Sequence, residues 1–327
     1  MNPVERNASA SAVQAGSSAM ARLITVALCT HNHRDRLIKT LQNLRALGLP
    51  KSSTELLVVD NASTDGTTEL LAAGHWRRPD WPTRVVREEK LGLSNARNRV
   101  IHEAAGEYIV FMDDDETPDT SWLVSYDRAI ARHRPDALGG RIEVMFEEGD
   151  RPKWLTDEIL AFVGKLDHGS GERLLNDRST PIFGGNFGFH REIFARIGNF
   201  DAALGRRGSA NIGGEDTEIY RRMIEMDCKV LWVPDAVIYH RIQTTKLRRS
   251  YFLDLHFRQG RVEGMRKRGQ QSRFPPRYLL PQLLRAVRAV WEQWRRDGRR
   301  SALRKEMNVA YFVGYILGWA FDGESRT

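Results

Sequence analysis

Four short apolar runs, separated by segments of helical character, constrain the fold of this chain more than any other feature. The runs cover residues 23–28, 55–60, 83–88 and 107–112. Helices are expected between them at 35–47, 67–73 and 94–105; Leu37, Leu41 and Leu44 show the helical spacing in the first. Strands that alternate with helices predict an α/β fold, with a mostly parallel central sheet covered by helices on both faces.

Polar residues follow the carboxyl end of each predicted strand. They are Thr30 and Asn32, then Asp60, then Arg87 and Glu88, and finally Asp113 and Asp115. In open sheets of parallel strands, ligands bind beyond the carboxyl ends of the strands. We therefore expect these side chains along one edge of the sheet, where they would form a ligand site.

The remaining elements complete the domain organisation. A helix at 121–132, a strand at 139–146, a helix from Glu215 and a strand at 230–240 are expected, followed by basic helices at 252–267, 279–296 and 303–321. We predict a disordered tail (1–21, with Met20 as an alternative start to Met1), a catalytic domain (22–243) and a helical basic region (244–327). The catalytic domain would comprise a nucleotide-binding half (22–120) and an acceptor-binding half (121–243).

Charge is distributed unevenly along the 327 residues. From Lys246 to Lys305 there are eighteen Lys and Arg against four acids, a local charge of +14, whereas the whole chain carries only +8. Such a basic block usually meets nucleic acid, an anionic membrane or a phosphorylated substrate. The hydrophobic content of 41% is that of a globular protein, and two cysteines exclude a disulfide scaffold or a four-cysteine zinc site.

Two segments suggest anion and cation chemistry. The run 111–116 ends a predicted strand in four consecutive acids, which repel one another unless a cation neutralises them. Carboxylate oxygens there suit Mg²⁺ or Mn²⁺; the alternative is a solvated acidic turn. A predicted helix start at Ser94 presents Arg97 and Asn98, which suit a diphosphate, although an ordinary basic surface helix is equally compatible.

Two later segments could complete a catalytic centre. Gly213 and Gly214 precede Glu215 and Asp216 at a predicted helix start, where the helix dipole favours carboxylates. His240 ends the late strand, and an imidazole beside an acidic cluster suits Mn²⁺. The alternatives are simple charge complementarity at the helix start and a structural histidine.

In their order along the chain, these segments resemble the family 2 glycosyltransferases of GT-A fold. The resemblance covers residues 23–240 and rests on eight short motifs: CTHNHRDRL (29–37), VVDNASTDGT (58–67), GLSNARN (92–98), FMDDDETP (111–118), GGNFGFHR (184–191), IGNFD (197–201), GGED (213–216) and AVIYH (236–240). It implies transfer of a sugar from a nucleotide-sugar donor to a hydroxyl, with inversion and with Mn²⁺ or Mg²⁺ as cofactor.

The resemblance also implies roles for individual residues. Donor-binding residues would be Thr30, Asn32, Asp60, Arg97, Asn98, Asp113, Asp114, Gly185 and Asn186; metal ligands would be Asp115, His240 and Asp113; and the catalytic pair would be Asp216 as general base with Glu215 beside it. Two departures stand out. Cys29 and His31 replace the proline and tyrosine of a frequent Pro-Thr-Tyr-Asn motif, and Glu116 replaces a frequent aspartate, which leaves the role of Glu116 open.

The basic carboxyl-terminal region lies outside the resemblance. In segment 279–296 one face is apolar and bears Trp291 and Trp294, with arginines beside it. Such a helix either lies on an anionic membrane or packs on the catalytic domain; nucleic-acid binding is disfavoured because no reader motif is present. We expect a cytoplasmic enzyme, peripheral on the inner membrane face, whose carbohydrate or lipid-linked acceptor belongs to polysaccharide or glycolipid assembly. A nucleotidyltransferase, or a basic binding protein with an inactive α/β domain, is the alternative.

Overall fold

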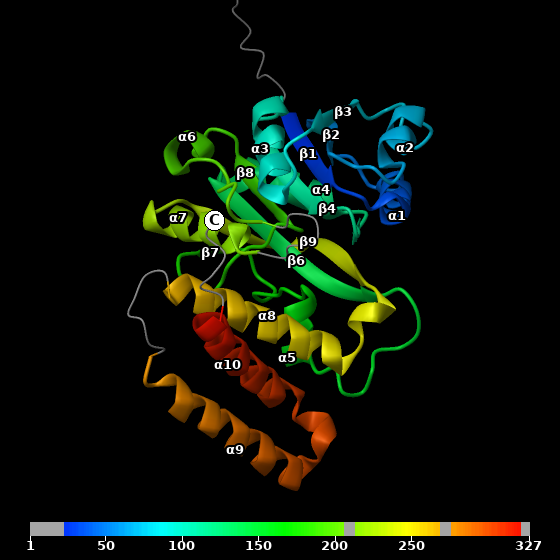
Figure 1. Ribbon diagram of the computed structural model, residues 1–327. Helices are drawn as coiled ribbons and strands as arrows, with labels where there is room; N and C mark the ends of the chain where they lie inside the picture. The colour runs from blue at the N-terminus through cyan, green and yellow to red at the C-terminus, as the bar shows by residue number, and fades with distance from the viewer. Residues whose placement is uncertain (1–22, 206–212, 269–275, 322–327) are drawn as a thin grey trace, which may run out of the picture.

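A nine-stranded sheet forms the centre of the protein (Figure 1). The computed structural model describes residues 23–205, 213–268 and 276–321. The strand order is β3-β2-β1-β4-β8-β6-β9-β5, and β7 pairs with β9 outside this order. The strands are β1 (Leu23–Thr30), β2 (Ser53–Asn61), β3 (Thr83–Glu88), β4 (Tyr108–Asp113), β5 (Glu116–Pro118), β6 (Ala137–Phe146), β7 (Arg173–Leu175), β8 (Phe187–His190) and β9 (Val230–Ile242).

Strand direction changes along the sheet. Strands β1 to β4 are parallel to their neighbours among themselves, as are β6 and β9. Strand β8 runs antiparallel to both β4 and β6, and β5 and β7 run antiparallel to β9. The carboxyl ends of β1, β2 and β4 therefore lie along one edge, as predicted, and a mixed half joins them through β8.

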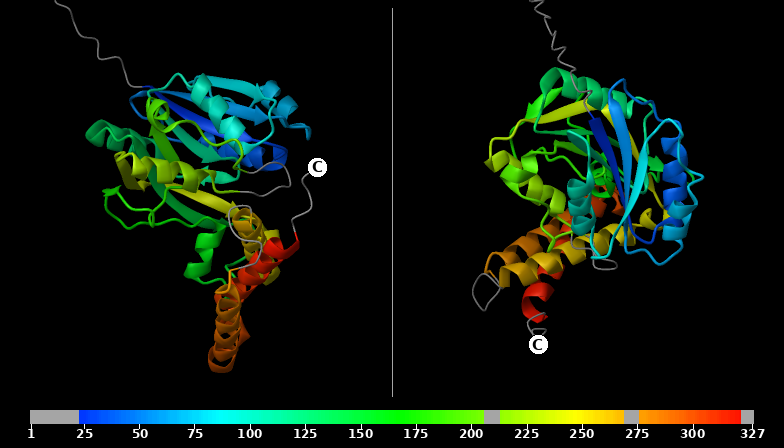
Figure 2. Two further views of the ribbon diagram at one scale, coloured as in Figure 1. Left: turned by 60° about the vertical axis from the view of Figure 1, so that its left-hand side comes forward. Right: turned by 90° about the horizontal axis from the view of Figure 1, so that it is seen from above.

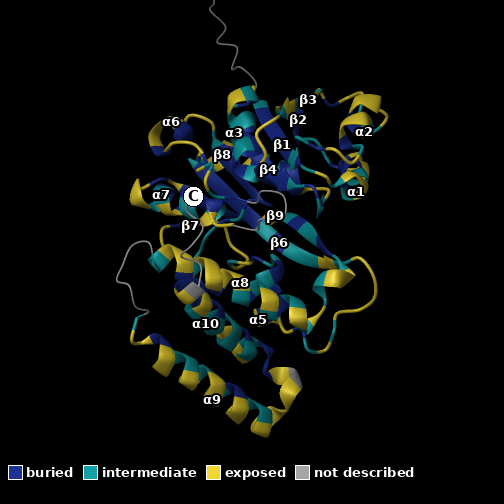
Figure 3. Cartoon of the chain, in the orientation of Figure 1, coloured by how far each residue is buried: buried dark blue, intermediate teal, exposed yellow. Residues whose placement is uncertain are grey.

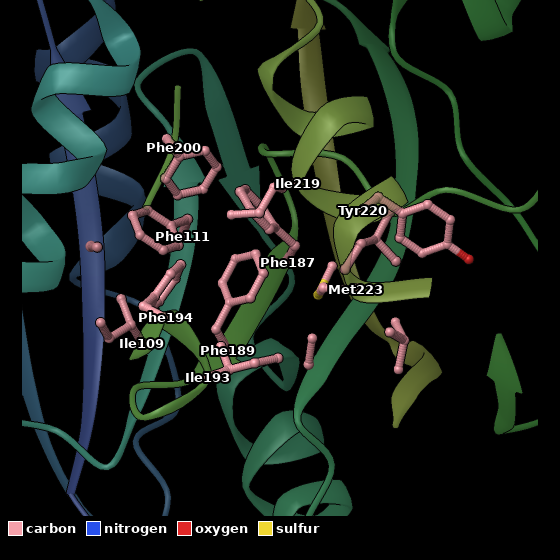
Figure 4. Packing of buried hydrophobic residues seen from close by; sticks show 14 of the residues in the cluster. Ile109, Phe111, Phe187, Phe189, Ile193, Phe194, Phe200, Ile219, Tyr220 and Met223 are labelled. Carbon is pink, nitrogen blue, oxygen red and sulfur yellow. The ribbon is translucent and has the colours of Figure 1, made fainter. Parts of the chain in front are cut away.

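Helices cover both faces of the sheet, as expected for this α/β fold. They are α1 (Arg34–Leu44), α2 (Thr67–Ala73), α3 (Leu93–Glu103), α4 (Trp122–His133), α5 (Asp157–Leu160), α6 (Ile193–Ile197) and α7 (Glu215–Glu225). Alternate residues of each strand enter different cores because strand side chains alternate between faces. Val58 packs in the core with α1, α2 and α4, whereas Val59 packs in the core with α3, α6 and α7. Figure 4 shows part of the second core.

Three helices form the carboxyl-terminal region: α8 (Arg249–Arg268), α9 (Leu279–Asp297) and α10 (Leu303–Phe321). Helix α8 lies against the part of the protein that contains the sheet, α10 lies against α8, and α9 lies against the outer side of α10 (Figures 1 and 2). Within the described residues, no helix combines the length and apolar character needed to cross a membrane. The expected tail, residues 1–21, lies outside the described residues.

Glycines bring α8 and α10 into close contact. A Cβ atom on Gly260 would lie 2.0 Å from the carbonyl oxygen of Tyr311, and one on Gly264 would lie 2.2 Å from that of Tyr315. On α10, a Cβ on Gly314 would similarly meet the carbonyl oxygen of Phe257 at 2.0 Å. The two backbones therefore touch, which only glycine permits at these positions.

Gly260→Ala should destabilise the protein. The added methyl group would force α8 and α10 apart, and such overpacking typically costs about 1–3 kcal/mol. This loss would appear although alanine is the better helix former. Gly171→Ala is the control, because a Cβ there meets no atom within 4 Å. Urea denaturation measures both; equal stability of the two variants would contradict the close contact.

Candidate active site

Two neighbouring cavities open at the carboxyl edge of the sheet. The strand-edge cavity, about 270 Å³, is lined by residues that include Thr30, His33 and Arg36. The helix-side cavity, about 210 Å³, is lined by residues that include Asp216 and His240. Asp113, Asp115 and Lys246 line both cavities. The acidic run thus stands at the junction between two spaces, each large enough to receive part of a substrate.

Asp115 and His240 meet at this junction. Strand β5 pairs with β9 so that Glu116 lies opposite His240, which brings the Nε2 atom of His240 to 3.5 Å from Oδ2 of Asp115. The other ring nitrogen, Nδ1, lies 2.8 Å from the carbonyl oxygen of Val163. A carbonyl can only accept, so Nδ1 carries a proton, and Nε2 is the ring nitrogen directed toward Asp115.

This arrangement fits a divalent cation. Metal-binding histidines usually donate their second ring N–H to a carbonyl or carboxylate, as His240 does. Within the described residues, no group of three or more His, Cys, Asp or Glu side chains could hold a metal alone. Mg²⁺ and similar ions commonly take only one or two carboxylates and complete their shell with water and substrate phosphates. Asp115 and His240 fit such a shared site.

The other acids of the run have different partners. Asp114 accepts a hydrogen bond from Thr30 Oγ1 at 2.6 Å and pairs with His33. The hydrogen bond between His33 and Asp114 raises the pKa of His33. Glu116 is buried and accepts from the backbone N–H of Asp113. Burial, reinforced by Asp113 and Asp115, raises the pKa of Glu116 well above its usual value, which favours the neutral acid. Of the four acids in this run, only Asp113 and Asp115 line both cavities.

Glu116 also explains Gly185. A Cβ atom on Gly185 would lie 2.0 Å from Oε1 of Glu116, so any larger residue would displace the buried carboxyl group. Gly185 lines the helix-side cavity, where it keeps this space open. The sequence left the role of Glu116 open. In the structure its carboxyl group stabilises the acidic turn by accepting the hydrogen bond from the backbone N–H of Asp113.

Arg97 forms ion pairs with carboxylates from two other elements. Its side chain on α3 is only 2% exposed, and it pairs with Asp113 at 3.6 Å, with Glu215 at 3.3 Å and directly with Asp216. Burial opposes its charge, but Asp216, Asp113 and Glu215 raise the pKa of the guanidinium on balance. Its Cζ atom lies 5.2 Å and 5.4 Å from the ring centres of Phe187 and Phe200, both labelled in Figure 4.

Asp216 faces the helix-side cavity, and Glu215 lies behind it. Gly214, at φ 112°, starts α7 in a conformation that favours glycine. Asp216 is 22% exposed, and its Oδ2 atom accepts from the backbone N–H of Gly184 at 2.9 Å. Glu215 is buried and does not line either cavity. Asp216 therefore has the access that a proton acceptor needs.

Five of the expected donor-binding residues do not line these cavities. Asp60 is buried and accepts from Ser63, Thr68 and Arg87. Asn32 binds the backbone of Thr64, and Asn98 binds that of Phe200 in both directions. Asn186 is buried in the β6–β9 irregularity, where its amide donates to the carbonyls of Arg141 and Ala236. Arg97, as described above, is also absent from both linings.

Other residues of the site were not identified from the sequence. Arg36, Lys246 and Tyr251 line the cavities, and Arg36 Nη1 lies 3.8 Å from Asp115 Oδ2. Arg241 is buried under the acidic turn and donates to the carbonyl oxygens of Asp114 and Glu116. The position of Arg241 directly after His240 was the only available signal, because its hydrogen-bond partners lie more than a hundred residues away.

The chain belongs to glycosyl transferase family 2. The sequence profile of this family matches residues 25–198, more than half of the chain, and confirms the expected resemblance. A mannosyltransferase from Pyrobaculum calidifontis, solved with GDP-Man and Mn²⁺, is similar in structure with a TM-score of 0.58 and 19% identity, covering 92% of this chain and 88% of that one. This likeness confirms the GT-A fold.

Curated relatives include two glycan-building proteins. Glucosyl-dolichyl phosphate glucuronosyltransferase of Haloferax volcanii is 25% identical over 158 residues, which are 47% of this chain and 49% of that protein. The succinoglycan biosynthesis protein ExoM of Rhizobium meliloti is 22% identical over 244 residues, 74% of this chain and of that one. The chain thus spans about half the length of the archaeal relative.

Arg97→Met should strongly destabilise the fold. Removing the guanidinium leaves carboxylates on β4 and α7 without their buried partner, and breaking a buried pair in this way typically costs about 3–5 kcal/mol. Arg99→Met, on the same helix, is the matched control. Arg99 pairs with Glu103 at the surface at 2.8 Å, and such pairs contribute at most about 1 kcal/mol. Urea unfolding measures the free energy of unfolding of both variants. Equal losses in the two would contradict a stabilising role for the buried ion pairs of Arg97.

Proposed function

We propose that the protein transfers a sugar from a nucleotide-sugar donor to an acceptor hydroxyl, with inversion at the anomeric carbon. The observation that carries the proposal is the junction of the two cavities. Asp113 and Asp115 face both spaces, and Asp216 faces only the helix-side cavity. Family membership supports the reaction class. The strand-edge cavity would hold the nucleotide, and the helix-side cavity would hold the sugar and the acceptor.

Asp216 would act as the general base. In the reaction, the acceptor oxygen attacks the anomeric carbon from the side opposite the diphosphate, the bond to the diphosphate breaks, and the hydroxyl proton passes to Asp216. The hydrogen bond from Gly184 and the contact with Arg97 hold this carboxylate in position. Because Glu215 is buried behind Asp216, the geometry favours Asp216 as the base.

The departing diphosphate would be bound by cationic groups at the cavity junction. A Mn²⁺ or Mg²⁺ ion held by Asp115 and His240 would supply Lewis-acid stabilisation of the leaving group. Arg36 lines the strand-edge cavity and Lys246 lines both cavities, so these side chains can contact the phosphates. Arg97 is committed to three carboxylates. We therefore assign to Arg97 the positioning of Asp113 and Asp216 rather than direct phosphate binding.

The acceptor would be a carbohydrate or a lipid-linked glycan. The relatives reported above are named for work on a dolichyl phosphate lipid and on succinoglycan. In this chain, Tyr251 of α8 lines the helix-side cavity, so one wall of the acceptor space belongs to the carboxyl-terminal helices. Action at the inner face of the cytoplasmic membrane is part of the same proposal. The family match favours sugar transfer over nucleotidyl transfer or an inactive domain.

Asp115→Asn should weaken Mn²⁺ binding at least tenfold when a nucleoside diphosphate is present. The variant keeps the size of the side chain but loses the anionic oxygen that a hard cation prefers. Titration calorimetry with Mn²⁺ measures the effect. Asp119→Asn is the control, because Asp119 lines neither cavity. Equal Mn²⁺ affinities of wild type and Asp115→Asn would exclude Asp115 as a ligand.

Asp216→Asn should lower the transfer rate by about 10²–10⁴-fold, the usual contribution of general-base catalysis, while donor affinity changes only a few-fold. The amide retains hydrogen-bonding capacity but cannot accept the proton. Glu218→Gln, two residues further along α7, is the matched control, since Glu218 pairs with Arg221 and Arg222 outside the cavities. A panel of nucleotide sugars with Mn²⁺, assayed for released nucleoside diphosphate, provides the rates. Full activity of Asp216→Asn would overturn the assignment of the base.

A further inference from the structure

Helix α9 has one broad apolar face, and only part of it is buried against the protein. The inner face packs on α10: Leu279 joins a core with Tyr315 and Trp319, and the indole N–H of Trp294 donates to Glu306 at 3.0 Å. Residues 280, 284, 287 and 291 lie on the adjoining part of the same face. The sequence predicted a single apolar face, and in the structure α10 covers only one part of it.

The outer side of α9 carries a continuous apolar stripe. The spacing of four, three and four residues places Leu280, Leu284, Val287 and Trp291 within a narrow sector of the helix. They are 60%, 61%, 48% and 55% exposed. In Figure 3 this helix is largely yellow and teal, at the margin of the molecule farthest from the sheet. Scattered exposed apolar residues are ordinary, whereas four in register on one helix form a docking surface.

Arginines border this stripe. Arg288 and Arg295 lie along its edge, and the Cζ atom of Arg295 is 4.6 Å from the ring centre of Trp291. Four arginines against two acids give α9 a charge of +2, and Arg277 immediately before the helix adds another. An apolar stripe of leucine and tryptophan with arginines at its side matches the boundary between acyl chains and anionic headgroups.

We propose that the outer stripe of α9, defined as Leu280, Leu284, Val287 and Trp291, docks the protein on an anionic lipid bilayer, with Arg288 and Arg295 at the phosphate groups. The stripe supplies apolar burial, and the arginines supply attraction that decreases with salt. A membrane accounts for both features together. A second copy of this chain would bring the same arginines against one another, and like charges oppose such contact.

Helix α9 is linked through α10 and α8 to one wall of the helix-side cavity. Phe162 lines that cavity, packs against His256 of α8 with ring centres 4.7 Å apart, and lies 5.1 Å beneath the guanidinium of Arg304 on α10. The cavity wall and the docking helix therefore belong to one packed assembly. The idea that a lipid-linked acceptor reaches the cavity in this way rests on the proposed function, but membrane docking itself does not.

The test uses the full-length protein and sedimentation with vesicles of pure phosphatidylcholine or of phosphatidylcholine containing phosphatidylglycerol. We expect binding to the anionic vesicles only, decreasing as salt rises. Combining Leu284→Ser with Trp291→Ser should reduce the partition coefficient at least tenfold, and combining Arg288→Gln with Arg295→Gln should reduce it roughly fivefold per arginine. The matched control combines Leu174→Ser with Met226→Ser, which are 54% and 49% exposed on other elements, and should bind as wild type does.

Three results would overturn the proposal. Absence of binding to the anionic vesicles is the first, and unchanged binding of the Leu284 and Trp291 double variant is the second. The third is light scattering that shows a dimer for wild type and a monomer for this variant, with vesicle binding unchanged, because the stripe would then join two copies. Release of nucleoside diphosphate in the absence of vesicles should be equal in all variants. Vesicle binding without any such release would overturn the proposed function and leave docking intact.

Discussion

The catalytic edge depends on the burial of one guanidinium. Arg97 sits on α3, yet its partners come from the end of β4 and the start of α7. A buried arginine is costly unless carboxylates surround it, and buried carboxylates are equally costly without a cation. Each side therefore stabilises the other only when β4 and α7 are correctly placed. The two aromatic rings beside Arg97 exclude water and strengthen this mutual dependence.

The acidic turn solves a related problem by giving each acid a separate environment. Asp114 accepts a hydrogen bond from Thr30 and pairs with His33, and the raised pKa of Glu116 favours its uncharged form. Arg241 holds the turn through two of its backbone carbonyls rather than through its carboxylates. Of the four acids in the run, only Asp113 and Asp115 line both cavities, a position that suits binding of a cation at the junction.

Sequence reasoning succeeded where the determining interactions are local. Strand β3 and helices α2 and α10 have the predicted bounds, because their apolar spacing decides them. The short strands β5, β7 and β8 were missed, since three or four residues carry no clear period and owe their conformation to pairing with β9, β4 and β6. The roles of Arg97 and Arg241 could not be predicted either. Arg97 resembles a ligand-binding residue in the sequence, because its partners Glu215 and Asp216 lie about 120 positions away along the chain.

The same limit applies to the carboxyl-terminal helices. Helical periodicity identified α9 as amphipathic, but it could not say that α10 would cover only part of the apolar sector. That outcome follows from the glycines of α8 and α10, which let these two backbones approach so closely that α10 presents one side to α8 and another to α9. Helix α9 is therefore held as an outer layer, one helix removed from α8, whose Tyr251 lines the helix-side cavity. The glycine contacts thus determine how the outward-facing stripe of α9 is attached to the helices beside the helix-side cavity.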